Sequence, residues 1–179
     1  MIITICGDLG SGKSTVAKIL ASKLDFKRKS VGDFMGELAL KRGLSLNELG
    51  EIAKHDGGEI DAILDEEQRK LKTSKENIIF DSRLGWFFVP DSFKVYLKVD
   101  INVATERIFK DHREDEKENV SLEETKKNII LRTNNNLERW DNHYKCGRYD
   151  DPKHFDLIID TTNISAEEVA EKIIEKLRI

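Results

Sequence analysis

Apolar residues fall into two kinds of pattern along this chain, and together they predict strands that alternate with helices. Short apolar runs, typical of buried strands, occupy residues 2–6, 77–81, 93–99 and 155–160. Longer stretches with apolar positions three or four residues apart indicate amphipathic helices. Because such alternation is typical of a parallel sheet covered on both faces, we predict an α/β fold.

The helical pattern has several interruptions. Helical spacing is present at residues 13–24, 33–75, 101–113, 121–140 and 165–177. Gly43 and the pair Gly57-Gly58 divide the second of these stretches into separate helices. A short basic segment at 26–30 stands where another strand is expected. The asparagine run lowers helix propensity, so the helix at 121–140 could break near Asn134.

Composition narrows the class of protein. The chain has 179 residues, 39% of them hydrophobic and 36% charged, and no apolar run approaches a membrane span. The net charge of −4 argues against a broad nucleic-acid surface. No segment before the first strand suits a signal peptide, and Cys6 and Cys146 lack metal-ligand spacing with the histidines. We expect a single domain over 1–179, a monomer, cytoplasmic, with reduced thiols and no membrane or nucleic-acid partner.

A Walker A pattern follows the first strand directly. Its residues are Gly7, Asp8, Leu9, Gly10, Ser11, Gly12, Lys13 and Ser14. The glycines let backbone N–H groups approach phosphate oxygens, and Lys13 adds a positive charge for the β and γ phosphates. The Ser14 hydroxyl suits Mg²⁺, and the following helix directs its positive dipole end at the anion. A turn that binds nothing is the alternative, but the flanking strand and helix favour a nucleotide-binding site that extends to Thr15.

A carboxylate and a guanidinium follow the strand at 77–81. Asp81 ends that strand at the sheet edge where the Walker A segment lies, because the carboxyl ends of parallel strands share one edge. Three roles stay open for Asp81: a Mg²⁺ ligand through water, a base that deprotonates a hydroxyl acceptor, and a simple strand-end cap. Arg83 lies two residues on, and we interpret it as a clamp for an anionic acceptor.

The helix at 121–140 carries a polar stripe. The stripe contains Arg132, Asn135, Asn136 and Arg139 at helical spacing. The opposite face, which we expect to pack, contains Ile130, Leu137 and Trp140. Near a triphosphate, two aligned arginines would stabilise the negative charge of the transferring phosphoryl group. An ordinary solvent-exposed face is the alternative.

Several segments together resemble the short, archaeal-type cytidylate kinases among the nucleoside monophosphate kinases. They are the Walker A segment, Ser30-Val-Gly-Asp33, Glu59-Ile-Asp61, Leu64-Asp65, Ser82-Arg83-Leu84 with Trp86, the arginines at 132 and 139, and residues 155–161. The resemblance implies a P-loop NTPase fold with a five-stranded parallel sheet, a helical acceptor-binding region at about 31–75 and a short lid at about 110–131. It also implies transfer of the γ-phosphoryl group of ATP to CMP or dCMP, with Mg²⁺.

The resemblance assigns further roles to individual residues. Arg83 would bind the acceptor phosphate, and Arg132 and Arg139 would close over the reaction from the lid. Arg107 and Thr162 would lie on either side of the adenine. The residues assigned to acceptor binding, besides Arg83, are Ser30, Asp33, Asp61 and Asp65. A carboxylate at 61 or 65 is suited to accept from the exocyclic amine of cytosine, although both equally suit solvated helix charges.

The chain departs from the family pattern at two positions. Gly36 occupies the place of an arginine for the acceptor phosphate, and Asp111 replaces a lid arginine, with Arg113 displaced by two residues. Loss of one charge-assisted contact costs about 1.5–3 kcal/mol, enough to change acceptor choice. Two alternatives therefore stay open. One is a P-loop kinase for the hydroxyl of a nucleoside or small metabolite, with Asp81 as base; the other is a nucleotide-binding regulator with little turnover.

Overall fold

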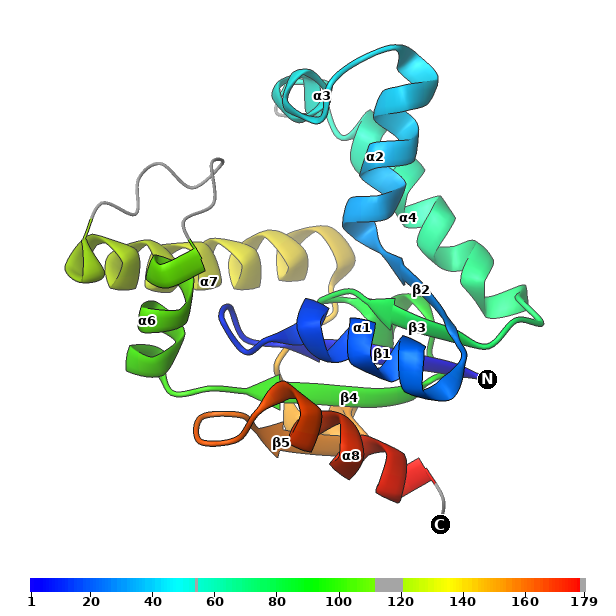
Figure 1. Cartoon of the computed structure of the whole chain (residues 1–179). Helices are drawn as coiled ribbons and strands as arrows, with labels where there is room; N and C mark the ends of the chain where they lie inside the picture. Colours follow the sequence, from blue (N-terminus) through cyan, green and yellow to red (C-terminus); the bar gives the residue numbers. More distant parts are fainter. Residues whose placement is uncertain (54, 112–120, 178–179) are drawn as a thin grey trace.

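The computed structural model describes residues 1–53, 55–111 and 121–177. Five parallel strands form one sheet in the order β2-β3-β1-β4-β5, with helices on both of its faces (Figure 1). The strands are β1 (Ile2–Gly7), β2 (Lys27–Ser30), β3 (Ile78–Asp81), β4 (Phe93–Lys98) and β5 (Leu157–Asp160). The predicted α/β fold with a five-stranded parallel sheet is therefore confirmed, including the short basic strand.

Helices of very different length connect the strands. They are α1 (Lys13–Leu24), α2 (Val31–Arg42), α3 (Leu46–Ala53), α4 (Glu59–Lys70), α5 (Gly85–Phe88), α6 (Ile101–Asp111), α7 (Leu122–Tyr144) and α8 (Ala166–Leu177), with the 3-10 turns η1 (Leu71–Thr73) and η2 (Pro152–His154). The expected acceptor-binding region at about 31–75 corresponds to α2, α3, α4 and η1. Of the expected lid at about 110–131, residues 112–120, and with them Arg113, lie outside the described residues.

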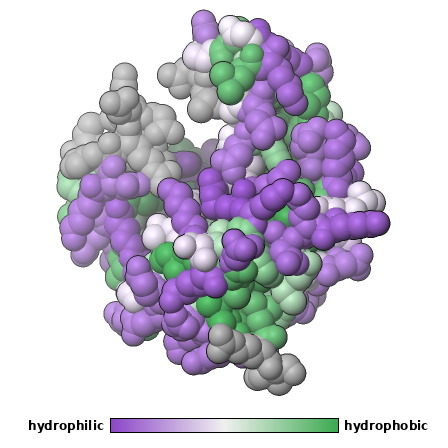
Figure 2. All heavy atoms as spheres, turned by 45° about the vertical axis from the view of Figure 1, so that its right-hand side comes forward, coloured by the Kyte–Doolittle hydropathy of each residue, from purple (hydrophilic) through white to green (hydrophobic). Residues whose placement is uncertain are grey.

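Two apolar clusters hold the helices against the sheet. Because strand side chains alternate between faces, Ile3 and Ile5 of β1 join one cluster and Cys6 joins the other. The first cluster packs α1 and α8 against the sheet, and the second packs α2, α4 and α5. Both cysteines are free thiols, as expected. Figure 2 shows that hydrophilic residues cover most of one face of the molecule, in keeping with a charge-rich composition.

The strand register places the Walker A segment, which follows β1, beside Asp81 at the end of β3. β1 is the central strand, and its neighbours β3 and β4 come from the middle of the chain. Ile5 of β1 pairs with Asp81 of β3, and Gly7 pairs with Leu97 of β4. The loop that leaves β1 therefore lies at the carboxyl edge of the sheet beside the end of β3, which is where a parallel sheet binds its ligands.

Helix α7 differs from its prediction in two respects. It continues through Asn134 to Tyr144, because packing of its last turns on the core outweighs the weak helix propensity of asparagine. Its packed face contains Ile129, which is 5% exposed, whereas Ile130 is 47% exposed. The expected packing of the C-terminal half is present, since Trp140 lies against the core cluster. Among the described helices, none is both long and apolar enough to cross a membrane.

Candidate active site

A pocket of about 660 Å³ opens at the carboxyl edge of the sheet, above the loop between β1 and α1. Five positively charged residues line it, and they come from four parts of the fold: Lys13 at the start of α1, Arg83 after β3, Arg107 and Lys110 from α6, and Arg132 from α7. Such a convergence of guanidinium and ammonium groups favours a polyanion as the ligand. The predicted grouping of Lys13, Arg83 and Arg132 around one site is therefore present in the structure.

Two glycines of the loop adopt backbone conformations that favour glycine. Gly10 has φ +75° and Gly12 has φ +83°, both in the left-handed region. A Cβ atom at Gly10 would lie 2.9 Å from the backbone of Ala104, so this glycine lets α6 approach the loop. A Cβ atom at Gly12 would meet no atom within 4 Å, so the space beside Gly12 is available to a ligand.

The ammonium group of Lys13 lies inside the loop. Its Nζ donates to the carbonyl oxygens of Gly7 at 2.9 Å and of Asp8 at 2.7 Å. Burial, and then the positive charge of Arg83, lower the pKa of Lys13 to about 8, although Asp81 opposes this effect. Lys13 is thus a cation at neutral pH that loses its proton more readily than an ordinary lysine.

Nucleotide affinity is expected to depend on pH through Lys13. As the pH rises through about 8, the free protein loses the ammonium charge, so its affinity for ATP should fall. Bound phosphate favours the charged form, so kcat should hold to higher pH than kcat/KM for ATP. Calorimetric titration with ATP from about pH 7 to about pH 9.5 measures the effect. A flat affinity would contradict it, and Lys18→Gln, at an exposed position of α1, is the control.

The carboxylate of Asp8 anchors the loop to β4. It accepts from the hydroxyl of Tyr96 at 2.6 Å and from the backbone N–H of Val99 at 3.0 Å. The Asp8 side chain therefore fixes the Walker A segment against the end of β4, with both carboxylate oxygens engaged there. The sequence could not indicate this, since Tyr96 lies 88 residues away.

Arg107 is fixed between the loop and the segment after β5. Its Nη2 donates to the carbonyl oxygen of Thr161 at 2.8 Å, and its Nη1 to that of Gly10 at 3.4 Å. Thr162 accepts at its own carbonyl and receives the N–H of Asp100 on its hydroxyl. Thr161 lines the pocket and is 2% exposed, although it is not among the predicted site residues. Its position directly after the last strand indicates a site residue, because parallel sheets bind ligands at the carboxyl ends of their strands.

The residues expected to hold Mg²⁺ suit such a site. Ser14 is exposed at the pocket, and Asp81 ends β3 close enough to Lys13 to affect its pKa. In the described part of the chain, no three His, Cys, Asp or Glu side chains gather as a metal site. Mg²⁺ does not require one, because it commonly takes one or two protein oxygens and completes its shell with phosphate and water. One hydroxyl and one carboxylate therefore fit this ion.

The arginine stripe of α7 divides between two places. Arg132 lines the pocket beside the Walker A segment, hereafter called the phosphate pocket for the ligand that its charges favour, whereas Arg139 forms an ion pair with Asp61 of α4. Seven residues of helix span about 10 Å, so the two guanidinium groups start from well-separated points. Both arginines were expected over the transferring phosphoryl group. In this structure only Arg132 lines the pocket, and Arg139 lies at the acceptor-binding region.

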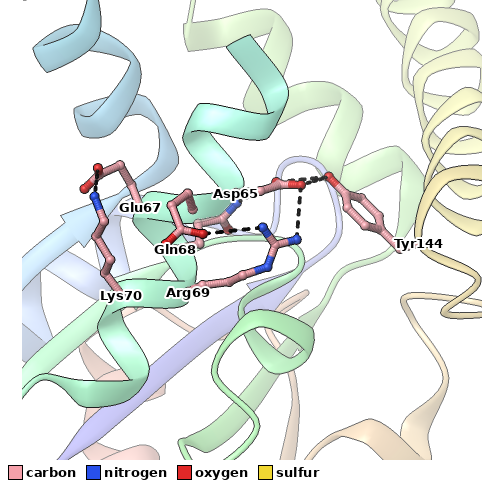
Figure 3. Close-up of polar contacts among 7 residues, drawn as sticks. Asp65, Glu67, Gln68, Arg69, Lys70 and Tyr144 are labelled. Carbon is pink, nitrogen blue, oxygen red and sulfur yellow. Dashed lines mark hydrogen bonds and ion pairs between the residues drawn. The ribbon is translucent and has the colours of Figure 1, made fainter. Parts of the chain in front are cut away.

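The remaining acceptor-region residues make defined contacts. Ser30 caps α2 by accepting from the backbone N–H of Asp33 at 3.0 Å, and Asp33 forms an ion pair with Arg28 at 3.1 Å. Asp65 is 6% exposed, and burial raises its pKa. Its carboxylate accepts from the hydroxyl of Tyr144 (Figure 3). The interpretation of Asp65 as a solvated charge is therefore wrong, because the fold buries it against α7.

Comparison with known proteins gives a consistent result. The model of the cytidylate kinase-like family matches residues 2–163. A cytidylate kinase of Sulfurisphaera tokodaii is 38% identical over 177 residues, covering 98% of this chain and 93% of that protein. A cytidylate kinase of Archaeoglobus fulgidus is 35% identical over 180 residues, covering 100% of this chain and 96% of that protein.

A longer relative and two solved structures extend the comparison. An S-adenosylmethionine-dependent nucleotide dehydratase of Lacinutrix mariniflava is 38% identical over 174 residues, or 97% of this chain, which spans only 35% of that protein. A shikimate kinase from Bacteroides thetaiotaomicron has a TM-score of 0.70 at 18% identity, covering 100% of this chain and 99% of the other. One from Aquifex aeolicus has a TM-score of 0.64 at 22% identity, covering 99% and 96%. These structures support the fold.

Proposed function

Because the chain belongs to the cytidylate kinase-like family, we propose that it transfers the γ-phosphoryl group of ATP to CMP or dCMP. The bond from the γ-phosphorus to the bridging oxygen breaks, and a bond to an oxygen of the acceptor phosphate forms, so the products are ADP and CDP or dCDP. The convergence of Lys13, Arg83, Arg107 and Arg132 on one pocket is the observation that carries the proposal. The kinase and dehydratase relatives are both named for nucleotides, which favours a nucleotide acceptor.

The residues of the pocket have complementary roles in this proposal. Backbone N–H groups of the loop and Lys13 hold the β and γ phosphates, while Arg83 and Arg132 neutralise the charge that spreads over the transferring group. The acceptor phosphate is already ionised, so positioning and positive charge suffice without a general base. Mg²⁺, held by Ser14 and Asp81, would neutralise phosphate charge when bound.

Arg107 and Thr162 are assigned to the adenine of ATP. Carbonyl oxygens of the loop and of residues 161–162 occupy the edges of the Arg107 guanidinium. Its planar face is what remains for a base, and a guanidinium stacks well on an aromatic ring. The acceptor is assigned to the region formed by α2, α3 and α4, on the other side of the phosphates.

An acceptor panel tests the proposal directly. ATP and Mg²⁺ are offered with nucleoside monophosphates, nucleosides and small alcohols such as shikimate, and formation of ADP is followed. We expect kcat/KM to be highest with CMP or dCMP. Turnover only with a hydroxyl acceptor would replace the proposal by the kinase with Asp81 as base. Nucleotide binding by calorimetry without turnover would identify a regulator.

Gly36→Arg is expected to lower KM for CMP by about tenfold, because it restores a charge-assisted contact to the acceptor phosphate. Gly36 lies on α2, and a Cβ atom there would meet nothing within 4 Å, so a side chain can start from this position without a clash. Gly36→Ala is the matched control, since it gains helix propensity without a charge and should raise only the melting temperature. Equal KM values for the arginine and alanine variants would contradict the assignment of this position.

A further inference from the structure

A chain of polar contacts runs through the buried side of α4. The hydroxyl of Ser82 donates to Oε1 of Gln68 at 2.9 Å, and Nε2 of Gln68 donates to Oδ1 of Asp65 at 3.4 Å. The hydroxyl of Tyr144 lies 3.0 Å from Oδ1 and 2.9 Å from Oδ2 of the same carboxylate (Figure 3). Ser82, Gln68 and Asp65 are all buried, so water competes little with these hydrogen bonds.

These contacts join three parts of the candidate active site. Ser82 stands between Asp81 and Arg83 at the end of β3. Tyr144 ends α7, the helix that carries Arg132 to the phosphate pocket. Helix α4, which belongs to the acceptor-binding region, is bonded to both. Its position is therefore set relative to the arginine after β3 and to the arginine of α7.

A second contact fixes α4 against α7. Asp61, Asp65 and Gln68 share one face of α4 by helical spacing, and Asp61 forms an ion pair with Arg139. Two contacts a helical turn apart restrain the rotation of α4 as well as its distance from α7. The ion pair of Glu67 with Lys70 lies on a different side of α4, away from Tyr144 (Figure 3).

We propose that Asp65, Gln68 and Tyr144 are positioning residues that hold the acceptor-binding helix at its working distance from Arg83 and Arg132. This inference rests on the proposed transfer to a nucleotide acceptor. Phosphoryl transfer requires reacting atoms about 3–3.5 Å apart, and a misplacement of about 1 Å can cost about 100-fold in rate. Asp65 acts here through Tyr144 and Gln68, with its charge directed to the protein and not to the acceptor base.

Tyr144→Phe tests the network, because it removes the hydroxyl and keeps the ring that packs against Phe87 and Phe88. We expect KM for CMP to rise by about tenfold, while KM for ATP changes by less than about twofold. A tyrosine with a merely structural role would lower the melting temperature without separating the two KM values.

Two variants serve as matched controls. Tyr96→Phe removes a hydrogen bond of the same kind, from the Tyr96 hydroxyl to the carboxylate of Asp8 in the Walker A segment. It should raise KM for ATP and leave KM for CMP nearly unchanged. Glu67→Gln removes the exposed ion pair of α4 and should change neither value. Tyr144→Phe thus probes the acceptor side of the site, Tyr96→Phe probes the ATP side, and Glu67→Gln probes the exposed face of α4.

A pH profile gives a second readout. Asp65 faces Tyr144 and His143 from α7 and Arg69 and Asp61 from α4; burial raises its pKa, and the Tyr144 hydroxyl opposes that effect most strongly. The network needs the carboxylate, which is lost as the pH falls. In Tyr144→Phe the loss of kcat/KM for CMP should therefore begin at higher pH than in the wild type. Ionisation of CMP is common to both enzymes, so the difference between the two profiles is diagnostic.

Each outcome decides the proposal. Equal KM values for CMP in the wild type and Tyr144→Phe, with coincident pH profiles, would overturn it. If Tyr144→Phe does not fold, Gln68→Met, which is similar in size and removes the hydrogen bonds to Ser82 and Asp65, is measured in the same way and decides by the same ratio of KM values. Failure of the proposed function looks different, since the wild type itself would not use CMP. The ratio of the variant's KM to the wild-type KM is then measured with the acceptor that the wild type uses. A wild type that phosphorylates no acceptor would overturn both the proposed function and this inference.

Discussion

Lys13→Ala is expected to lower kcat by about 100- to 1000-fold, because it removes a preorganised positive charge from the phosphates. In the structure the ammonium is anchored beside the loop by the carbonyl oxygens of Gly7 and Asp8. Steady-state kinetics with ATP, Mg²⁺ and CMP measures the loss. Retention of more than about a tenth of kcat would contradict the role given to Lys13.

Stability provides the control for this variant. Burial lowers the pKa of Lys13 to about 8, so below that pH the folded protein carries an ammonium that would be better solvated in the unfolded chain. Removing it relieves that cost, and water in the open pocket can replace its hydrogen bonds. The melting temperature of Lys13→Ala at neutral pH should therefore be no lower than that of the wild type. Lys18→Ala, at an exposed position of α1, should keep full activity.

Arg83→Ala is expected to lower kcat/KM for CMP by about 1000-fold, with a much smaller effect on binding of ATP alone. Arg83 follows directly from Ser82 after the end of β3 and lines the pocket together with Lys13 and Arg132. A guanidinium at this position offers two parallel N–H donors to a phosphate, which no other residue type supplies. Initial rates at varied CMP, together with calorimetry for ATP, separate the two effects.

Arg83→Lys is the informative companion of the alanine variant. It keeps the positive charge and loses the planar fork, so an intermediate activity would show that geometry contributes beyond charge. Full activity and unchanged CMP affinity in Arg83→Ala would remove the clamp from the mechanism. The pKa of Lys13 gives an independent readout, because the charge of Arg83 contributes to lowering it. Nucleotide affinity in Arg83→Ala should therefore persist to higher pH.

Local sequence was sufficient to predict the phosphate loop. The apolar strand, the glycines and the helix that begins at Lys13 are contiguous, so their geometry depends on near neighbours. The alternating pattern of strands and helices likewise determines a parallel sheet and the edge at which ligands bind. For these features the one-dimensional pattern and the three-dimensional arrangement carry the same information.

Contacts between distant segments could not be predicted in this way. The sequence does not show that Tyr96 bonds to Asp8, and Asp65 resembles a surface charge until Tyr144 covers it. Arg139 was grouped with Arg132 because both share a helix face, but α4 supplies Asp61 as a partner. In each case the missing information is which side chain of another element arrives at the same point. Helical spacing predicts which side chains share a face of a helix, but it does not predict which residue of another element contacts them.

The central place of β1 has a consequence for biosynthesis. Ile3 pairs with Ile79 on one side and with Phe93 on the other, so β1 is synthesised before both of the strands that it pairs with. Until those strands are synthesised, its isoleucines have no sheet to cover them, and the phosphate loop lacks the tyrosine that anchors it. Sheets dominated by such distant pairings fold slowly and expose aggregation-prone intermediates. Nascent chains of this protein should therefore depend on chaperones until β4 has emerged.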